Sequence, residues 1–464
     1  MQRVFLIICA VVTVGGCLDV YLELKQHPIP KDEDVGEPLI LTPLIESGQI
    51  EFAKEKAAVK HDEMMNISSY SGFFTVNKTY NSNLFFWFIE AETNPESAPV
   101  VLWLQGGPGS TSMIGLFAEN GPFSVTSNIT LDFRKYSWHK NHSVIYLDNP
   151  VAAGYSFTNS DDGYADDAID IGQGILSMLI QFFDLFPQYQ RNEFYVTGES
   201  YAGKYIPVIG SLINAHNNNI EVKINLKGLA IGNGLVDPYH QLEFGDYLYQ
   251  IGLIDDNGRN QFHALENEAR ALIKQANYLE AFKVFQKIIF RNKPGISSLF
   301  QDLTGFNGHY NFLTTEDSHS STYFSKWIQR RDVRKAIHVG NLTFSSRSNP
   351  VALHLRSDFP KSVTPYLIDS LRHYKVLIYN GQLDIIAAYP MTVNYLRHLG
   401  WPSIADYKIA PRKKWYSGGE LAGYTKSVGN LTEILVRNAG HMVPKDQPMW
   451  AWDMITRFTH GESF

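Results

Sequence analysis

Ser200 stands in VTGESYAGKY, residues 196–205, where an apolar run ends in a turn. Gly198 and Ala202 place small residues two positions before and two positions after it, as required by a sharp strand–turn–helix that exposes a serine hydroxyl. The strict form of this pattern has glycine where Ala202 stands. The stretch predicts a nucleophilic serine. Glu199 is an awkward neighbour, because an ionised carboxylate would oppose an oxyanion formed beside it.

A nucleophilic serine needs a base to take its proton and an acid to orient that base. When the serine lies on such a turn, the acid and then the histidine follow it along the chain, each just after a strand. Asp384 follows the apolar run KVLIY, and His441 follows TEILV. We predict that they are the acid and the base. Asp148 also follows an apolar run but precedes Ser200, so we assign it a structural role.

The tetrahedral intermediate of acyl transfer carries a negative oxygen that needs two backbone N–H donors. Tyr201, directly after the serine, supplies the first. The glycine-rich stretch WLQGGPGSTS, residues 103–112, exposes further amides, of which that of Gly107 is the best placed. The HExxH, P-loop and full GxGxxG patterns are absent from the sequence, so we expect neither a metal nor a cofactor.

The elements that must position these residues indicate an α/β fold. Short continuous apolar runs are typical of strands buried on both faces, and several of them alternate with helical patterns. This alternation predicts a mostly parallel sheet that is covered on both sides. The expected strands are 99–105, 143–148, 193–198, 226–233 and 375–381, and the clearest helices are 166–186 and 202–216.

Two further regions complete the organisation. Residues 70–91 hold two aromatic and β-branched runs around a polar turn, which predicts an antiparallel hairpin. Residues 239–325 show helical patterns without strands, which predicts a helical cap over the carboxyl edge of the sheet, where such folds bind ligands. The catalytic core then comprises residues 61–238 and 326–464.

The N-terminus has the pattern of an export signal. Arg3, the apolar run VFLIICAVVTV and two glycines predict a signal peptide over residues 1–17. Residues 18–60 are polar and charged, and we expect an N-terminal arm or a propeptide there. No later segment approaches the roughly 18 apolar residues of a membrane span. The net charge of −7 is spread along the chain, which argues against a nucleic-acid partner.

The sequons agree with export, whereas the cysteine content is unusual for an exported chain. Six Asn-x-Ser/Thr sequons are glycan acceptors. VGGC, residues 14–17, also fits a bacterial lipidation site, but six sequons in one exported chain favour glycosylation. Cys9 and Cys17 lie in or beside the signal, so we expect no disulfide in the mature chain. The acceptors are Asn66, Asn77, Asn128, Asn141, Asn341 and Asn430.

Four motifs in order, WLQGGPG, GESYAGKY, YNGQLD and NAGHMVPKDQP, with YLDNPVAAGYSF among them, resemble the serine carboxypeptidase family, most closely its vitellogenic-like branch. The resemblance extends from about residue 60 to the C-terminus. It implies an α/β-hydrolase that removes C-terminal residues through an acyl-enzyme, usually at acid pH. On the matching positions it implies Ser200, Asp384 and His441 as the triad, with the amides of Gly107 and Tyr201 as the oxyanion hole.

The resemblance also implies a site for the terminal carboxylate of the substrate. Gln105 and Glu199 would bind it, and Glu119 would support them. Gln105 departs from the asparagine usual in the family, although its longer amide can still donate to a carboxylate. The same pocket would be shaped by Trp103, Gly106 and Met442. Many relatives pin the cap with disulfides, which this mature chain cannot do, so we expect a more mobile cap.

These observations favour a carboxypeptidase acting on peptide and protein C-termini, secreted or lysosomal/endosomal, as a monomer or homodimer without nucleic-acid or membrane partners. Two alternatives stay open. An acyltransferase or esterase would not use a carboxylate-binding set, and a non-catalytic secreted binding protein would not need a triad. Burial beside a second carboxylate would raise the pKa of Glu199. Protonated at acid pH, Glu199 could donate a hydrogen bond to the substrate carboxylate.

Overall fold

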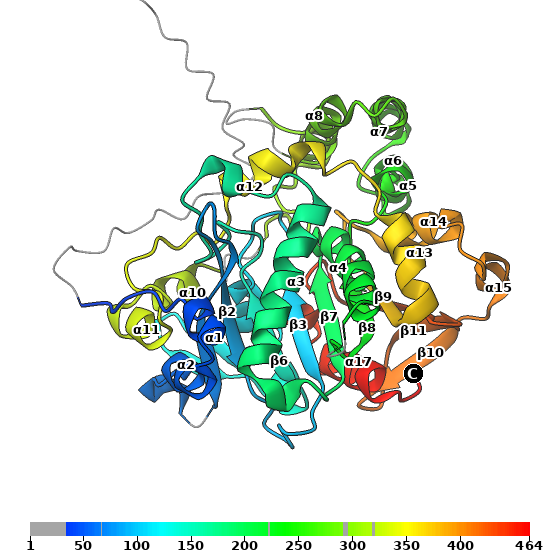
Figure 1. Ribbon diagram of the computed structural model, residues 1–464. Helices are drawn as coiled ribbons and strands as arrows, with labels where there is room; N and C mark the ends of the chain where they lie inside the picture. The colour runs from blue at the N-terminus through cyan, green and yellow to red at the C-terminus, as the bar shows by residue number, and fades with distance from the viewer. Residues whose placement is uncertain (1–33, 66, 221–222, 291–295, 318–320) are drawn as a thin grey trace, which may run out of the picture.

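A ten-stranded mixed sheet forms the centre of the molecule (Figure 1). The structure, a computed structural model, describes residues 34–65, 67–220, 223–290, 296–317 and 321–464. The strand order is β1-β2-β6-β3-β7-β8-β9-β12-β11-β10. The strands are β1 Ser69–Asn77, β2 Ser82–Ile89, β3 Val100–Leu104, β6 Ser143–Leu147, β7 Phe194–Glu199, β8 Leu226–Gly232, β9 Lys375–Gly381, β10 Lys413–Ser417, β11 Glu420–Val428 and β12 Leu431–Val436.

The six middle strands are parallel to one another, and their order is β6-β3-β7-β8-β9-β12. Their residues are almost all buried, because helices cover both faces of the sheet. In β3, Leu102 and Leu104 pack with helices α3 (Ala168–Leu185) and α4 (Ala202–Asn217), whereas Trp103 packs with α17 (Pro448–His460) on the opposite face. The mostly parallel, helix-covered sheet predicted from the apolar runs is confirmed.

Antiparallel hairpins close both edges of the sheet. The β1–β2 hairpin was predicted, and its aromatic residues pair across the strands, as Phe74 does with Phe86 at 4.6 Å between ring centroids. The sequence patterns did not predict the β10–β11 hairpin or the small pair β4 (Phe123–Val125) and β5 (Leu131–Phe133). These strands are short or half exposed, so they lack the continuous apolar runs of the middle strands.

A long excursion separates β8 from β9. Its first part is a group of helices that lies together beyond one end of the sheet (Figure 1). Those helices are α5 Pro238–Gln241, α6 Phe244–Gln250, α7 Asp256–Lys274, α8 Tyr278–Ile288 and α9 Leu299–Thr304. Further helices of the chain are α10 Ser321–Trp327, α11 Arg331–Ala336, α12 Asn349–His354, α13 Thr364–His373, α14 Tyr389–His398, α15 Ile404–Ile409 and α16 Val443–Asp446.

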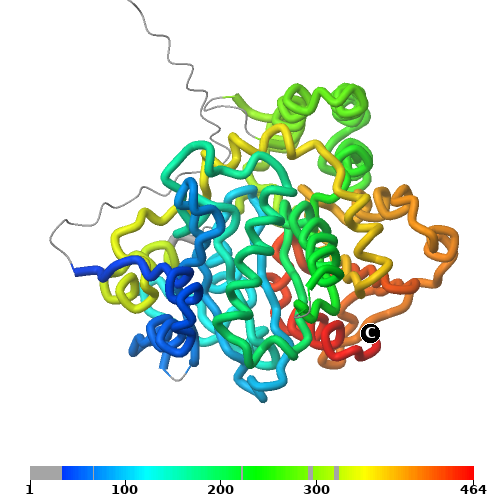
Figure 2. Tube along the Cα trace, viewed as in Figure 1, coloured from blue at the N-terminus to red at the C-terminus, as the bar shows by residue number. Residues whose placement is uncertain are grey.

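The N-terminal arm packs on the body from residue 34 onward. Its helices are α1 Thr42–Glu46 and α2 Ile50–Ala57, and Leu41 is fully buried beside them. Leu41 N donates to Phe73 O at 2.9 Å, which attaches the arm to β1. The start of the arm lies beside α11 (Figures 1 and 2), where Lys335 pairs with Asp34 at 2.5 Å. The signal peptide expected at residues 1–17, with its two cysteines, lies outside the described residues.

Helix α3 corrects the expectation that no later segment could span a membrane. By length and composition it passes that test. However, half of it is buried inside the protein, between α4 and the N-terminal helices, as in a core helix. Its N-terminus is capped by Asp167, whose carboxylate accepts hydrogen bonds from the backbone N–H groups of Ile169 and Asp170.

Candidate active site

Ser200 lies on a strained turn between β7 and α4. Its φ of 62° falls in the left-handed region, which is uncommon for a non-glycine residue. The turn is held by hydrogen bonds from Ser200 N to Gly232 O at 3.0 Å and from Leu235 N to Ser200 O at 2.9 Å. A Cβ on Gly198 would lie 2.2 Å from Leu104 O, which explains the small residue before the serine. This is the sharp strand–turn–helix geometry that the sequence predicted around Ser200.

Asp384 and His441 are brought together at the carboxyl ends of β9 and β12. His441 Nδ1 lies 2.8 Å from Asp384 Oδ2, and both side chains are buried. Asp384 also accepts hydrogen bonds from Asn233 Nδ2 at 2.6 Å and from Ile386 N at 3.0 Å. Burial alone would lower the pKa of His441, but the charge and hydrogen bond of Asp384 outweigh it, so the pKa is raised. The arrangement suits a base whose protonated form must be stabilised.

One cavity connects Ser200 with this pair. Ser200 and His441 both line it, together with Gly107, Tyr201 and Asn233. The rest of its wall is largely apolar and comes from the excursion between β8 and β9 and from the loop after β9. The apolar lining residues are Leu235, Phe244, Phe285, Ile289, Phe290, Phe359 and Ile386.

The glycine-rich loop packs directly against the nucleophile turn. A Cβ on Gly106 would lie 2.6 Å from both Ser200 Cβ and Tyr201 N, so only glycine allows this approach. Gly107 has a φ of 118° and lines the cavity beside Tyr201. Asp148 fixes the loop from behind, because its carboxylate accepts from Ser112 N at 2.9 Å. That contact fits the structural role expected of Asp148.

Gln105 lies between the two glutamates singled out in the sequence. Trp103 Nε1 can only donate, and it lies 3.0 Å from Gln105 Oε1, which fixes the orientation of the amide. Gln105 Nε2 then donates to Glu199 Oε1 at 2.7 Å and to Glu119 Oε1 at 3.2 Å. Both amide hydrogens are therefore directed at glutamates, so a substrate carboxylate would have to replace one of these acceptors.

Glu119, at the end of the π-helix Gly115–Glu119, and Glu199 form a buried acid pair. Burial raises the pKa of Glu119 to about 7, although hydrogen bonds from Glu199 and Gln105 limit the rise. Burial and the charge of Glu119 raise the pKa of Glu199 well above its ordinary value. Two like charges at one buried site oppose each other, so the pair favours a state in which at least one carboxyl group is protonated.

The three residues expected to shape the pocket differ in position. Trp103 is fully buried and stacks edge-to-face on Trp138 at 5.3 Å, so it acts on the pocket through Gln105 rather than by lining it. Gly106 provides close contact with the serine turn. Met442 is partly buried and follows His441. A second cavity of about 390 Å³ is lined by Glu119, with Arg134, Lys135 and Lys445 among its other residues.

The sequence patterns missed Asn233 and Tyr310, which contact the predicted acid and base. Asn233 directly follows β8 at the same sheet edge, and its position after a parallel strand was the available signal. Tyr310 comes from the excursion between β8 and β9, and its ring stacks on the His441 imidazole at 4.8 Å. No local pattern marked Tyr310, because its role depends on how the excursion folds back.

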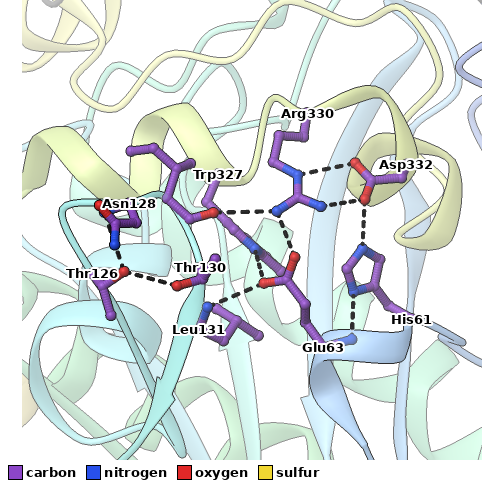
Figure 3. Close-up of polar contacts among 10 residues, drawn as sticks. His61, Glu63, Thr126, Asn128, Thr130, Leu131, Trp327, Arg330 and Asp332 are labelled. Atoms are coloured by element: carbon purple, nitrogen blue, oxygen red, sulfur yellow. Dashed lines mark hydrogen bonds and ion pairs between the residues drawn. The ribbon is translucent and has the colours of Figure 1, made fainter.

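Among the described residues, His61, Glu63 and Asp332 form a group with metal-ligand chemistry (Figure 3). Arg330 already occupies it, because its Nη1 lies 2.6 Å from Glu63 Oε1 and its Nε lies 3.1 Å from Asp332 Oδ1. His61 Nε2 lies 3.1 Å from Asp332 Oδ2. A resident cation therefore neutralises these carboxylates, and the group joins the segment before β1 to α11.

The expected glycan acceptors are mostly at the surface. Asn141 is half-buried. Asn66 lies outside the described residues. Asn430 is exposed overall, but its Nδ2 donates to Leu371 O at 2.9 Å. The remaining exposed acceptors are Asn77, Asn128 and Asn341.

Comparison with known proteins agrees with the geometry. A family model described as serine carboxypeptidase matches residues 60–461. The venom serine carboxypeptidase of Apis mellifera is 55% identical over 97% of this chain and 96% of its own length. The probable serine carboxypeptidase CPVL of Homo sapiens is 46% identical over 97% of this chain and 95% of its own.

A solved structure extends the comparison to the fold. The crystal structure of Kex1(delta)p, a prohormone-processing carboxypeptidase from Saccharomyces cerevisiae, superposes with a TM-score of 0.77 at 24% identity. The superposition covers 88% of this chain and 96% of the Kex1(delta)p chain. At that identity the match supports the fold alone, and it confirms the predicted α/β-hydrolase architecture.

Proposed function

Because the chain belongs to the serine carboxypeptidase family, we propose that it releases C-terminal residues from peptides at acid pH, using Ser200, Asp384 and His441. The observation that carries this proposal is the position of the acid pair. Glu199 is the residue directly before Ser200, and Gln105 bonds it to Glu119, which lines the second cavity. Such a set of donors beside a nucleophile selects a free chain end.

We propose an acyl step in which each of these residues has one role. Ser200 Oγ attacks the last peptide carbonyl while His441 takes its proton, and the amides of Gly107 and Tyr201 hold the resulting oxyanion. The C–N bond then breaks, and the protonated His441 returns its proton to the amine of the released residue. Water attacks the acyl-enzyme by the same route and regenerates Ser200. Asp384 holds the imidazole by its hydrogen bond and stabilises the imidazolium.

The lining of the two cavities suggests where the substrate residues lie. We propose that the residue before the cleaved bond enters the apolar cavity formed by Phe285, Phe290 and Phe359 with their neighbours. A large apolar side chain at that position then buries most surface. The released residue lies toward Glu119 and the second cavity.

We also propose that the chain works in the secretory pathway, as a secreted or a lysosomal protein. The expected signal peptide and the exposed sequons support this destination. The names of two relatives, a venom carboxypeptidase from Apis mellifera and a vitellogenic carboxypeptidase from Aedes aegypti, agree with export.

The test compares an N-blocked dipeptide ending in a free acid with its C-terminal amide, at about pH 5 and about pH 7.5. We expect release of the last residue from the acid form only, and mainly at pH 5. Ser200→Ala should reduce turnover by at least about 10⁴-fold, as removal of an acyl-transfer nucleophile does. Equal turnover of the amide would refute carboxylate selection, and an unchanged Ser200→Ala variant would refute the nucleophile.

A further inference from the structure

A short segment of the excursion, residues 307–317, contacts both loops that carry the proposed acid and base. We call this segment the strap. His441 N donates to Tyr310 O at 2.7 Å. On the other loop, Ile385 N donates to His309 O at 3.3 Å, and Phe312 N donates to Leu383 O at 2.9 Å. These two bonds flank Asp384, so a single backbone segment ties the acid loop to the base loop.

Tyr310 adds a side-chain contact to this backbone connection. Its ring lies nearly parallel to the His441 imidazole, with 4.8 Å between centroids and 16° between planes. Hydrogen bonding to Asp384 fixes the imidazole at Nδ1 but leaves rotation about that bond. A flat ring stacked on one face restricts this rotation. The same ring lines the catalytic cavity, so it also covers that face of the base.

The strap requires a glycine before the histidine. A Cβ on Gly440 would lie 2.2 Å from Tyr310 O. Gly440 has no positive φ, so the close approach of the strap explains the glycine better than backbone conformation does. The far end of Tyr310 is held as well, because Arg347 Nη2 lies 3.3 Å from its hydroxyl oxygen. Arg347 in turn forms a backbone bridge with Ser110 of the glycine-rich loop.

We propose that Tyr310 is a positioning residue for the reaction: its ring, stacked on His441, sets the orientation in which the imidazole faces Ser200. The inference rests on the proposed roles of Ser200 and His441. Tyr310 takes no proton and forms no bond in the reaction. The feature that matters is the aromatic face, so phenylalanine should replace tyrosine and an aliphatic residue should not.

The test uses a readout that needs no carboxylate recognition. A fluorescent fluorophosphonate labels an activated serine, and its second-order rate constant reports how well the base activates Ser200. We expect Tyr310→Leu to slow labelling and to lower kcat by about 10- to 100-fold, in line with the cost of about 1 Å of misplacement. Tyr310→Phe should stay within about threefold of the parent on both measures. Tyr416→Leu, at an exposed tyrosine of β10, is the matched control and should change neither.

A spectroscopic measurement separates positioning from a general loss of structure. The hydrogen-bonded Nδ1 proton of His441 gives a strongly deshielded proton resonance, which we expect to persist in Tyr310→Phe and to broaden or vanish in Tyr310→Leu. If the thermal transition shows that Tyr310→Leu does not fold, Tyr310→Met takes its place, because its longer and flexible side chain adapts to the space without a ring. Labelling of the aliphatic variant within twofold of the parent, with its resonance intact, refutes the proposal. Equal slowing of Tyr310→Phe refutes the role of the ring.

Labelling of Ser200 and release of the C-terminal residue can fail independently, so the two proposals are tested separately. If the parent protein is labelled at Ser200 but releases no C-terminal residue, carboxypeptidase activity fails as a proposal while the effect of Tyr310 on labelling can still be read. If the parent releases residues normally and Tyr310→Leu does too, the function stands and the positioning role falls.

Discussion

The carboxyl group of Glu199 accepts a hydrogen bond from Gln105, which also donates to Glu119, and Ser200 is the next residue along the chain. The neighbour that looked unfavourable for a nucleophile is therefore not an isolated anion. Its pKa is raised by burial and by the charge of Glu119, and Tyr379 is buried close to both glutamates. The fields of Asp384, His441, Lys445 and Arg134 also reach this pair.

Glu199→Gln should remove the pH dependence of substrate binding. In the parent, the fully protonated acid pair can donate a hydrogen bond to the substrate carboxylate, so KM should rise as the pair begins to ionise at about pH 7, the pKa of Glu119, because its negative charge then opposes that carboxylate. Glutamine donates at every pH, so KM should change less than about threefold between pH 5 and pH 8. Glu96→Gln, at an exposed site, is the control. Parallel pH profiles of KM in the parent and the variant would contradict the role of Glu199.

The same pair has a consequence for stability. A carboxyl group whose pKa is raised on folding stabilises the protein fully below its unfolded pKa, and this contribution is lost as the pH rises through the folded value. For Glu119 this loss takes place between pH 4.5 and about pH 7. It lowers the free energy of unfolding by about 3 kcal/mol. Thermal unfolding should therefore show the parent losing stability over this window, and Glu199→Gln should lose less.

At the scale of elements, Glu63 joins three segments that are distant in sequence (Figure 3). Its Oε2 accepts from Trp327 Nε1 of α10 at 3.0 Å and from Leu131 N of β5 at 3.1 Å. Its Oε1 pairs with Arg330. Burial tends to raise the pKa of Glu63, but these hydrogen bonds outweigh it and lower the pKa. Glu63 should therefore stabilise the fold above its ordinary pKa and lose that effect as the pH falls through the lowered value.

Glu63→Ala should cost about 1–3 kcal/mol, because it leaves the indole N–H of the fully buried Trp327 without its partner. Glu63→Gln keeps an acceptor and loses only a half-exposed ion pair, so it should cost no more than about 1 kcal/mol. Urea denaturation at neutral pH measures both, with Glu55→Ala on the exposed face of α2 as the control. Glu63 lines neither cavity, so turnover should be unchanged. Equal stability of the two variants would show that the indole contact does not matter.

At the scale of the whole molecule, the N-terminal arm belongs to the body from residue 34 onward. Leu41, Ala53 and Ala57 are buried in the main core, and the arm bonds to β1 through Phe73 in both directions. These contacts argue that a propeptide ending at residue 60 would remove part of the core. A cleavage before residue 34 would leave them all in place.

Two truncated chains test whether residues 34–57 belong to the folded body of the protein. A chain beginning at residue 34 should retain the thermal stability and turnover of the mature protein. A chain beginning at residue 58 should lose at least the ~2–5 kcal/mol that deleting one buried leucine costs, and should be largely unfolded or inactive. Full stability of the shorter chain would show that residues 34–57 are a removable propeptide after all.

The sequence by itself determined the sheet, the order of the proposed triad and its place at the strand ends. These features are local: continuous apolar runs specify buried strands, and the turn after β7 needs its small residues whatever the rest of the chain does. The β10–β11 hairpin was not predicted, because its half-exposed strands lack a continuous apolar run.

Only the tertiary structure decided which side chains meet. Gln105 bridges two glutamates, Asn233 reaches Asp384, and Tyr310 stacks on His441. Each contact joins segments about 14 to 151 positions apart, set by strand register and by the path of the excursion. No spacing along the chain encodes such a contact, because it exists only once the sheet has brought the loops to one edge.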